Sequence, residues 1–274
     1  MQNNIQQAEA KWVKTLYQYC RNTFSSCHIP SHDESHHLRV WHICKEALLE
    51  FNKKGESFSY DVIEALIFAV FFHDTGLTVN KGENHGLESK QIFLSFLEKN
   101  QIKFKLQYEV AQAIEYHDDK SYKNEYTKQS PYSIFNILCI CDDLDAFAYT
   151  GIYRYIEIYL MRNCTIEKLA DQVLRNLNKR LKNFEHQYRN HEAFFSRFYN
   201  KYIITRDFFE LLKKETKNNN YKKTGKVVQL IQKQVVINQQ SVFDIEKAIP
   251  LSDYDEYVQN YFNKLLRENK AQNM

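Results

Sequence analysis

Glycine and proline are scarce in this chain, and their scarcity limits the folds open to it. The 274 residues include only 6 glycines and 3 prolines. Both residues favour turns and loops, so a chain with so few of them has little room for hairpins and favours long helices. The glycine-rich phosphate-binding loops are also excluded, because neither GxxxxGK[ST] nor GxGxxG occurs in the sequence. We therefore predict an all-α protein.

The charges of the chain almost balance, with 37 Lys and Arg against 34 Asp and Glu and a net charge of +3. This balance argues against a protein that coats or processes nucleic acid, which needs a dominant basic face. The first twelve residues lack the apolar core of a signal peptide. The longest strongly apolar run, Ala65–Phe72, is far shorter than the roughly 20 residues of a membrane span. We expect a soluble, cytoplasmic protein with no membrane partner.

Polar punctuation divides the chain into predicted helices. They cover residues 8–21, 31–51, 60–74, 85–99, 105–117, 133–149, 153–161 and 254–267, with a long amphipathic stretch that begins near Leu169. The lysine-rich segment 213–226 is predicted to be an exposed loop, and residues 229–236 suit a helix or a strand. The six cysteines show no CxxC spacing, so we predict reduced, buried thiols. We predict one helical bundle over residues 1–162 and a helical extension over 163–274, which packs on the core or on a partner subunit.

His73 and Asp74 are the most informative pair of residues, because they stand at the inner end of the predicted apolar helix. Beside a run of Ile, Phe and Val, an imidazole and a carboxylate face a large desolvation cost unless they are paired or bind a metal. Taken alone, a His-Asp pair that caps the end of the helix explains them equally well. Four other predicted helices, however, also bring an imidazole or a carboxylate to a core-facing position: His36 or His37, His85, His117, and Asp142 with Asp145. A shared cation explains five such helices better than five separate buried polar groups.

Three sequence motifs then suggest a family. They are SHDxxHxxRV at residues 31–40, FFHDTGL at 71–77 and LDAxxxxGIxR at 144–154. In this order they resemble the HD-domain metal-dependent phosphohydrolases, which are all-α bundles, and in particular small bacterial members of poorly defined substrate. The resemblance covers under half of the chain. It departs from the usual pattern at Ile140, where an acidic residue is common, and at Asp143, where an arginine is usual.

The resemblance implies a set of metal ligands. It selects His36 over His37 and Asp142 over Asp143, a choice that helical periodicity leaves open for the two histidines. The implied ligands of the first metal are His36, His73, Asp74 and Asp142, and those of a second metal are His85 and His117. This mixed nitrogen and oxygen set suits Mn, Fe, Co, Ni or Zn, and less well Mg, as one ion or two. Cys44 and Cys141 lie near these ligands in the sequence and are predicted to be core residues.

Seven further residues are secondary candidates, each with a structural alternative. His32, Asp33, Glu88 and Asp145 are candidates for supporting a ligand or for acid–base work, although Asp33 also suits a helix cap and Asp145 a structural hydrogen bond. Arg39, Lys81 and Arg154 are candidates for binding a substrate phosphate, although basic residues of this kind are more often simply solvated.

These residues predict an enzyme: a phosphatase, phosphodiesterase or pyrophosphohydrolase in which a metal-activated water attacks a small phosphorylated molecule, with a nucleotide as the first candidate. The alternative is a metal-retaining sensor or scaffold of the HD-domain type that binds a nucleotide or an acidic partner without turnover. The basic segment 213–226 motivates that alternative. A homodimer is left open.

Overall fold

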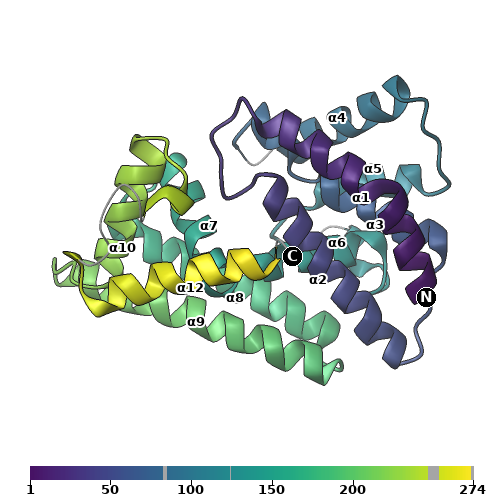
Figure 1. Cartoon of the computed structure of the whole chain (residues 1–274). Helices are drawn as coiled ribbons and strands as arrows, with labels where there is room; N and C mark the ends of the chain where they lie inside the picture. Colours follow the sequence, from purple (N-terminus) through teal and green to yellow (C-terminus); the bar gives the residue numbers. More distant parts are fainter. Residues whose placement is uncertain (83–84, 124, 246–252, 273–274) are drawn as a thin grey trace. The chain divides into compact units, whose positions relative to one another are not determined.

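The computed structural model describes residues 1–82, 85–123, 125–245 and 253–272 (Figure 1). Within these residues the regular structure is helical throughout and includes no strand, which confirms the predicted all-α class. The same residues contain no helix with both the length and the apolar character needed to cross a membrane. All six cysteines are free thiols. Cys20, Cys44, Cys139 and Cys141 are buried, as predicted, whereas Cys27 and Cys164 are half-buried.

The chain forms two compact units whose segments alternate along the sequence. The first unit comprises residues 1–27, 32–145 and 183–195, and the second comprises 28–31, 146–182 and 196–274. This division differs from the predicted boundary at residue 162, because the helix that follows residue 145 belongs to the second unit and residues 183–195 return to the first. That residues 163–274 form an extension packing on the core or on a partner subunit stays a prediction.

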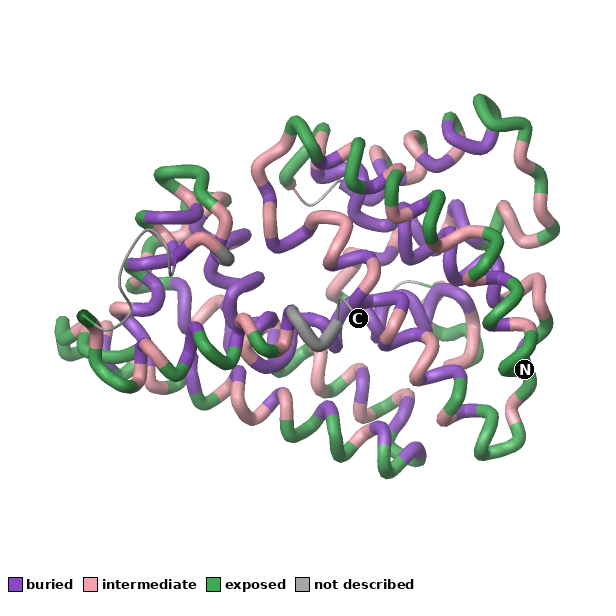
Figure 2. The backbone as a smooth tube through the Cα atoms, in the orientation of Figure 1, coloured by how far each residue is buried: buried purple, intermediate pink, exposed green. Residues whose placement is uncertain are grey.

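The first unit is a bundle around one apolar helix, α3 (Tyr60–Phe72). Its other main elements are α1 (Gln2–Phe24), α2 (Glu34–Lys53), η1 (Thr75–Thr78), α4 (His85–Lys99), α5 (Gln107–Tyr116), η2 (Glu125–Lys128) and α6 (Ile134–Asp145). Helix α3 contacts α1, α2, α4, α5 and α6 (Figure 1). Every residue from Ile63 to Phe72 is buried (Figure 2), because a helix that is apolar on all sides must be covered on all sides.

Several helix ends in this unit differ from their predicted positions, among them the start of α1 at Gln2 and the end of α3 at Phe72, which leaves His73 and Asp74 outside the helix. Helix α2 begins at Glu34, and Asp33 is its N-cap, because its carboxylate accepts a hydrogen bond from the Ser35 backbone N–H at 2.9 Å. The predicted cap was Ser31. Helix α6 ends at Asp145 and not at residue 149, because the chain turns there and Ala148 adopts a φ of 63°.

The regular elements described in the second unit are helices of very different length. They are α7 (Ala148–Met161), α10 (Thr224–Ile231), the π-helix η3 (Gln232–Ile237), the short η4 (Val242–Asp244) and α12 (Glu256–Gln272), together with most of α8 (Ile166–Tyr188) and α9 (Glu192–Lys217). Gly151, predicted to interrupt the helical pattern, lies inside α7. A Cβ atom at this glycine would lie 2.1 Å from the Ala146 carbonyl carbon, so the tight turn before α7 requires a glycine.

The predicted exposed loop over residues 213–226 is wrong at both ends. Residues 213–217 complete α9, and α10 begins at Thr224. Glu215 is buried, and its carboxylate accepts hydrogen bonds from the backbone N–H groups of Lys223 (2.8 Å) and Gly225 (2.7 Å). The carboxylate thus satisfies donors at the start of α10 that would otherwise lack partners. Residues 229–236, ambiguous in sequence, are helical.

Candidate metal centre

Four buried side chains of the first unit converge on one point: one from α2, one from α6 and two from the turn that follows α3. The ligand atoms of His36, His73, Asp74 and Asp142 all lie within 4.8 Å of one another. The Nε2 atoms of His36 and His73 are 3.1 Å apart, and Asp74 Oδ2 lies 3.2 Å and 3.3 Å from them. Asp142 Oδ1 lies 3.5 Å from the Nε2 atom of His36. The structure therefore brings together the four residues predicted as ligands of the first metal.

A second buried group shares Asp74 with the first. The Nε2 atoms of His85 and His117 are 3.2 Å apart, and each lies 3.1 Å from Asp74 Oδ1. One oxygen of Asp74 thus faces His36 and His73, and the other faces His85 and His117. Asp74 belongs to both groups that could hold a metal ion, so its carboxylate is placed to join two cations.

The four imidazoles share one arrangement. The Nδ1 atom of each ring forms a hydrogen bond with an oxygen atom that is not a candidate ligand, and its Nε2 atom faces the centre. A ring whose Nδ1–H is donated to an oxygen presents the Nε2 lone pair, which is the state that binds a metal. The Nδ1 partners are Asp145 Oδ2 for His36 (2.8 Å), Val70 O for His73 (2.7 Å), Gly82 O for His85 (2.9 Å) and Ile114 O for His117 (2.7 Å).

This donor set fits a cation. Imidazole nitrogens 3.1–3.2 Å apart repel one another unless a proton or a metal ion lies between them, and the carboxylates around them are buried. Buried charges of one sign require compensation. Imidazole and carboxylate ligands without thiolate suit the divalent first-row transition metals. The side chains present therefore fit one or two such ions.

The pKa values of His73 and Asp74 show that the imidazoles and carboxylates stabilise each other's charged forms. Burial lowers the pKa of His73, but the carboxylates of Asp74 and Asp142 outweigh it and raise that pKa to about 10. Burial raises the pKa of Asp74, but the imidazoles around it hold that pKa well below its usual value. Without a metal, a proton on His73 therefore balances part of the negative charge.

We predict that metal affinity rises with pH because the ion must displace this proton. A group protonated up to about pH 10 competes with the metal at every lower pH, so the apparent affinity should increase by up to about tenfold per pH unit. Titrations of Mn²⁺ into metal-free protein at pH 6.5, 7.5 and 8.5 would measure this. Calorimetry in buffers of different ionisation enthalpy should show proton release, and a pH-independent affinity would contradict the prediction.

Asp145 joins the ligand His36 to Arg39 through hydrogen bonds. Its Oδ2 accepts from His36 Nδ1, and its two oxygens accept from the guanidinium of Arg39, with Nε–Oδ1 at 2.9 Å and Nη2–Oδ2 at 3.0 Å. Of the two predicted uses of Asp145, the structural hydrogen bond is present. Arg39 is only 4% exposed, so it is a buried partner of Asp145 and not a solvated residue at the surface. Its role toward phosphate stays a prediction.

The other secondary candidates lie in varied environments. The buried ring of His32 has its centroid 5.5 Å from that of His36, and Asp33 caps α2 as its structural alternative predicts. Glu88 is half-buried in the first turn of α4, whereas the Nδ1 atom of His85 is bonded to the Gly82 carbonyl. Lys81 is exposed in the loop before α4, and Arg154 is buried in α7 of the second unit.

Sequence reasoning missed Lys120. Its Nζ atom lies 3.2 Å from Asp142 Oδ2 and 3.0 Å from Asp143 Oδ1. Asp143 also accepts a hydrogen bond of 2.6 Å from the Tyr122 hydroxyl. The only available signal was that Lys120 follows His117 by three residues, and it carried little weight because α5 ends at Tyr116. Helical periodicity does not place side chains in a loop.

Gly86 lets α4 approach α5 closely enough for His85 to reach His117. A Cβ atom at Gly86 would lie 2.3 Å from the Glu115 carbonyl oxygen, so any larger residue must push the two helices apart. We predict that Gly86→Ala weakens the second metal group more than the first, which would lower metal content from two ions to one per chain. Elemental analysis would measure this. The matched control is Leu87→Ala, at an exposed position on the same helix; equal metal content in the two variants would contradict the prediction.

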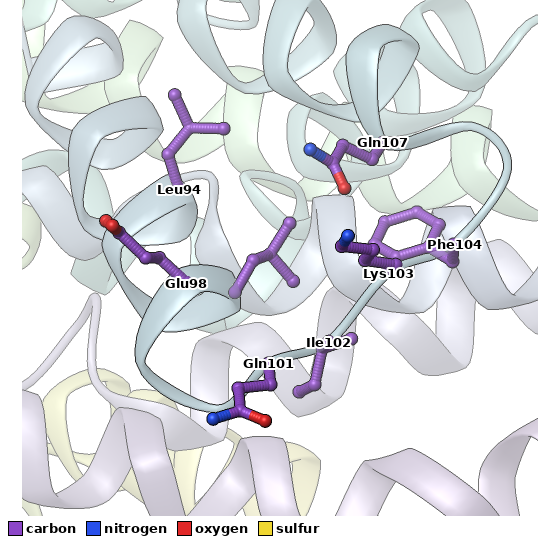
Figure 3. Close-up of a pocket in the computed structure, with 8 residues that line it drawn as sticks. Leu94, Glu98, Gln101, Ile102, Lys103, Phe104 and Gln107 are labelled. Carbon is purple, nitrogen blue, oxygen red and sulfur yellow. The ribbon is translucent and has the colours of Figure 1, made fainter.

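A separate hollow of about 850 Å³ lies at the turn between α4 and α5. Figure 3 shows Leu94 and Glu98 on the helix and Ile102, Lys103 and Phe104 on the connecting chain. None of the candidate metal ligands lines it, so it has no part in the chemistry argued below.

Comparisons with protein-family models, with curated proteins and with solved structures find no match for this chain.

Proposed function

We propose that this chain is a metal-dependent phosphohydrolase of the HD-domain type, acting on a phosphoester or pyrophosphate bond of a small phosphorylated substrate, with a nucleotide as the first candidate. The observation that carries the proposal is the position of Asp74 between two groups of imidazoles. Its Oδ2 lies 3.2 Å from His36 Nε2, and its Oδ1 lies 3.1 Å from both His85 and His117 Nε2. Paired metal sites of this kind serve displacement at phosphorus.

His36, His73, Asp74 and Asp142 would hold one ion, and Asp74, His85 and His117 would hold the other. Bound there, divalent ions lower the pKa of water and polarise a phosphoryl oxygen. The chain's own contribution is orientation. The Nδ1 bonds fix each imidazole, and Asp145 fixes His36 while Arg39 fixes Asp145.

The charge of the centre supports an anionic substrate. The centre contains two basic side chains, Arg39 and Lys120, and four buried carboxylates, those of Asp74, Asp142, Asp143 and Asp145. With neutral imidazoles this set carries two negative charges. One divalent ion balances it, and two ions make it positive, so the doubly loaded centre attracts an anion such as a phosphate ester.

The proposal is tested by metal content and turnover measured on one preparation. Protein loaded with Mn²⁺, Co²⁺, Ni²⁺, Zn²⁺ or Mg²⁺ would be assayed with p-nitrophenyl phosphate, bis-p-nitrophenyl phosphate and a panel of nucleotides. We expect up to two ions per chain and hydrolysis that a chelator abolishes and added metal restores. Protein that retains no ion after dialysis would overturn the proposal. Bound metal without turnover on the whole panel would instead favour the sensor or scaffold, although the exposed basic loop that motivated it is shorter than predicted.

A further inference from the structure

Lys120 places an ammonium group beside the candidate centre from outside the ligand set. Its Nζ atom donates to the His117 carbonyl oxygen at 3.2 Å and to Asp142 Oδ2 at 3.2 Å, and it lies 3.0 Å from Asp143 Oδ1. The side chain is 13% exposed. Lys120 is therefore bonded both to the backbone just after α5 and to two carboxylates of α6.

Asp142 separates this ammonium from the centre by the width of one carboxylate. Its Oδ1 faces His36 Nε2 at 3.5 Å and its Oδ2 faces Lys120. When a cation at the centre shares the charge of Asp142, the attraction between this carboxylate and Lys120 weakens. The ammonium can then turn toward another anion without leaving the neighbourhood of the centre.

Arg39, the other basic side chain at the centre, is less able to make this move. Its planar guanidinium bonds Asp145 through both Nε and Nη2 and donates to Ser35 Oγ at 3.0 Å. A lysine ammonium is a compact charge on a flexible stem, and its three hydrogens can be redirected by rotation. Of the two cations, Lys120 is the one whose geometry allows a change of partner.

We infer that Lys120 binds a phosphoryl group of the substrate, and that Asp142 and Asp143 hold its ammonium at the centre until that group arrives. The inference rests on the proposed function for the chemistry of the substrate. It assigns a substrate-binding role to a residue outside the three sequence motifs. Asp143 sets how readily Lys120 changes partner, because its carboxylate competes with the phosphoryl group for the same ammonium.

The first test measures binding of inorganic phosphate and of pyrophosphate to the Mn²⁺-loaded full chain by calorimetry, apart from any turnover. Lys120→Met should raise the Kd for these anions by about ten- to a hundredfold, the loss expected for one charged hydrogen bond. Lys120→Arg should recover most of the affinity. Lys123→Met removes an exposed lysine from the same loop and should leave the Kd unchanged.

The second test uses Asp143→Asn, which keeps the shape of the side chain and removes the competing charge. Its Kd for phosphate should fall, and the gain should disappear in the Lys120→Met/Asp143→Asn double variant, because it depends on Lys120. Should Lys120→Met bind less metal or unfold, Asp143→Asn and Lys120→Arg still carry the test. Equal Kd values for wild type and Lys120→Met, or a gain that persists in the double variant, would overturn the inference and leave the hydrolase proposal standing. Absence of anion binding by the loaded wild type would overturn both.

Discussion

Asp74→Ala should abolish both metal sites in one step, because each oxygen of this carboxylate serves a different group. We expect metal content to fall from two ions to none or to one weakly held ion per chain. The proposed hydrolysis should decrease by more than about a hundredfold, because about a hundredfold is already the upper range for losing a residue that only supports a ligand. Elemental analysis and steady-state kinetics on the same preparation would measure the two effects.

Two further variants make the Asp74 result specific. Asp74→Asn keeps the volume of the side chain and removes the charge, so it should lose the metals while leaving the packing intact. Asp61→Asn changes a carboxylate in the first turn of α3, where its side chain is 43% exposed and pairs with Lys105 at 3.4 Å, and should behave as wild type. Retention of two ions by Asp74→Asn would show that the carboxylate does not join the two groups.

Arg39→Met should cause the largest loss of stability among single replacements of charged residues discussed above. It leaves the buried carboxylate of Asp145, which is 3% exposed, without its guanidinium partner. Removing one partner of a buried ion pair typically costs about 3–5 kcal/mol of unfolding free energy. Urea unfolding with a chelator present would measure it. Metal affinity should also fall by about ten- to a hundredfold, since Asp145 orients His36.

The control for Arg39 is an exposed ion pair. Arg189 pairs with Glu185 one turn away on the protein surface, where its side chain is 70% exposed. Arg189→Met should change the unfolding free energy by less than about 0.5 kcal/mol, because exposed pairs contribute little. Unfolding of both variants at the same urea concentration would contradict a stabilising role for Arg39.

Much of the fold was predictable from local sequence. The apolar run that became α3 is buried along its length from Ile63 to Phe72, since no helix of that composition is stable in contact with water. The helix boundaries were less accurate. The end of α6 at Asp145 depends on a turn at Ala148 and on the space available at Gly151, and neither is encoded in hydrophobic periodicity.

The residues of the candidate centre were also predictable only in part. Helical periodicity and the sequence motifs predicted His73, Asp74, His85 and His117 as ligands. Periodicity alone could not decide whether His36 or His37 faces the centre. The structure places His36 in the centre, whereas the ring of His37 packs near Phe24 and Phe71. Neighbouring residues in a helix point about 100° apart. The packing of α2 on α3 and α6 decides which of the two histidines faces the centre.

By itself, the sequence determined that this chain is helical and which residue types converge on its buried centre, because helix formation and burial follow short-range patterns of apolar and polar side chains. Only the tertiary structure decided that the two oxygens of Asp74 face different imidazole pairs, that Arg39 is enclosed with Asp145, and that Lys120 reaches Asp142 from a loop. These contacts join residues distant in sequence, and their geometry depends on how whole helices pack.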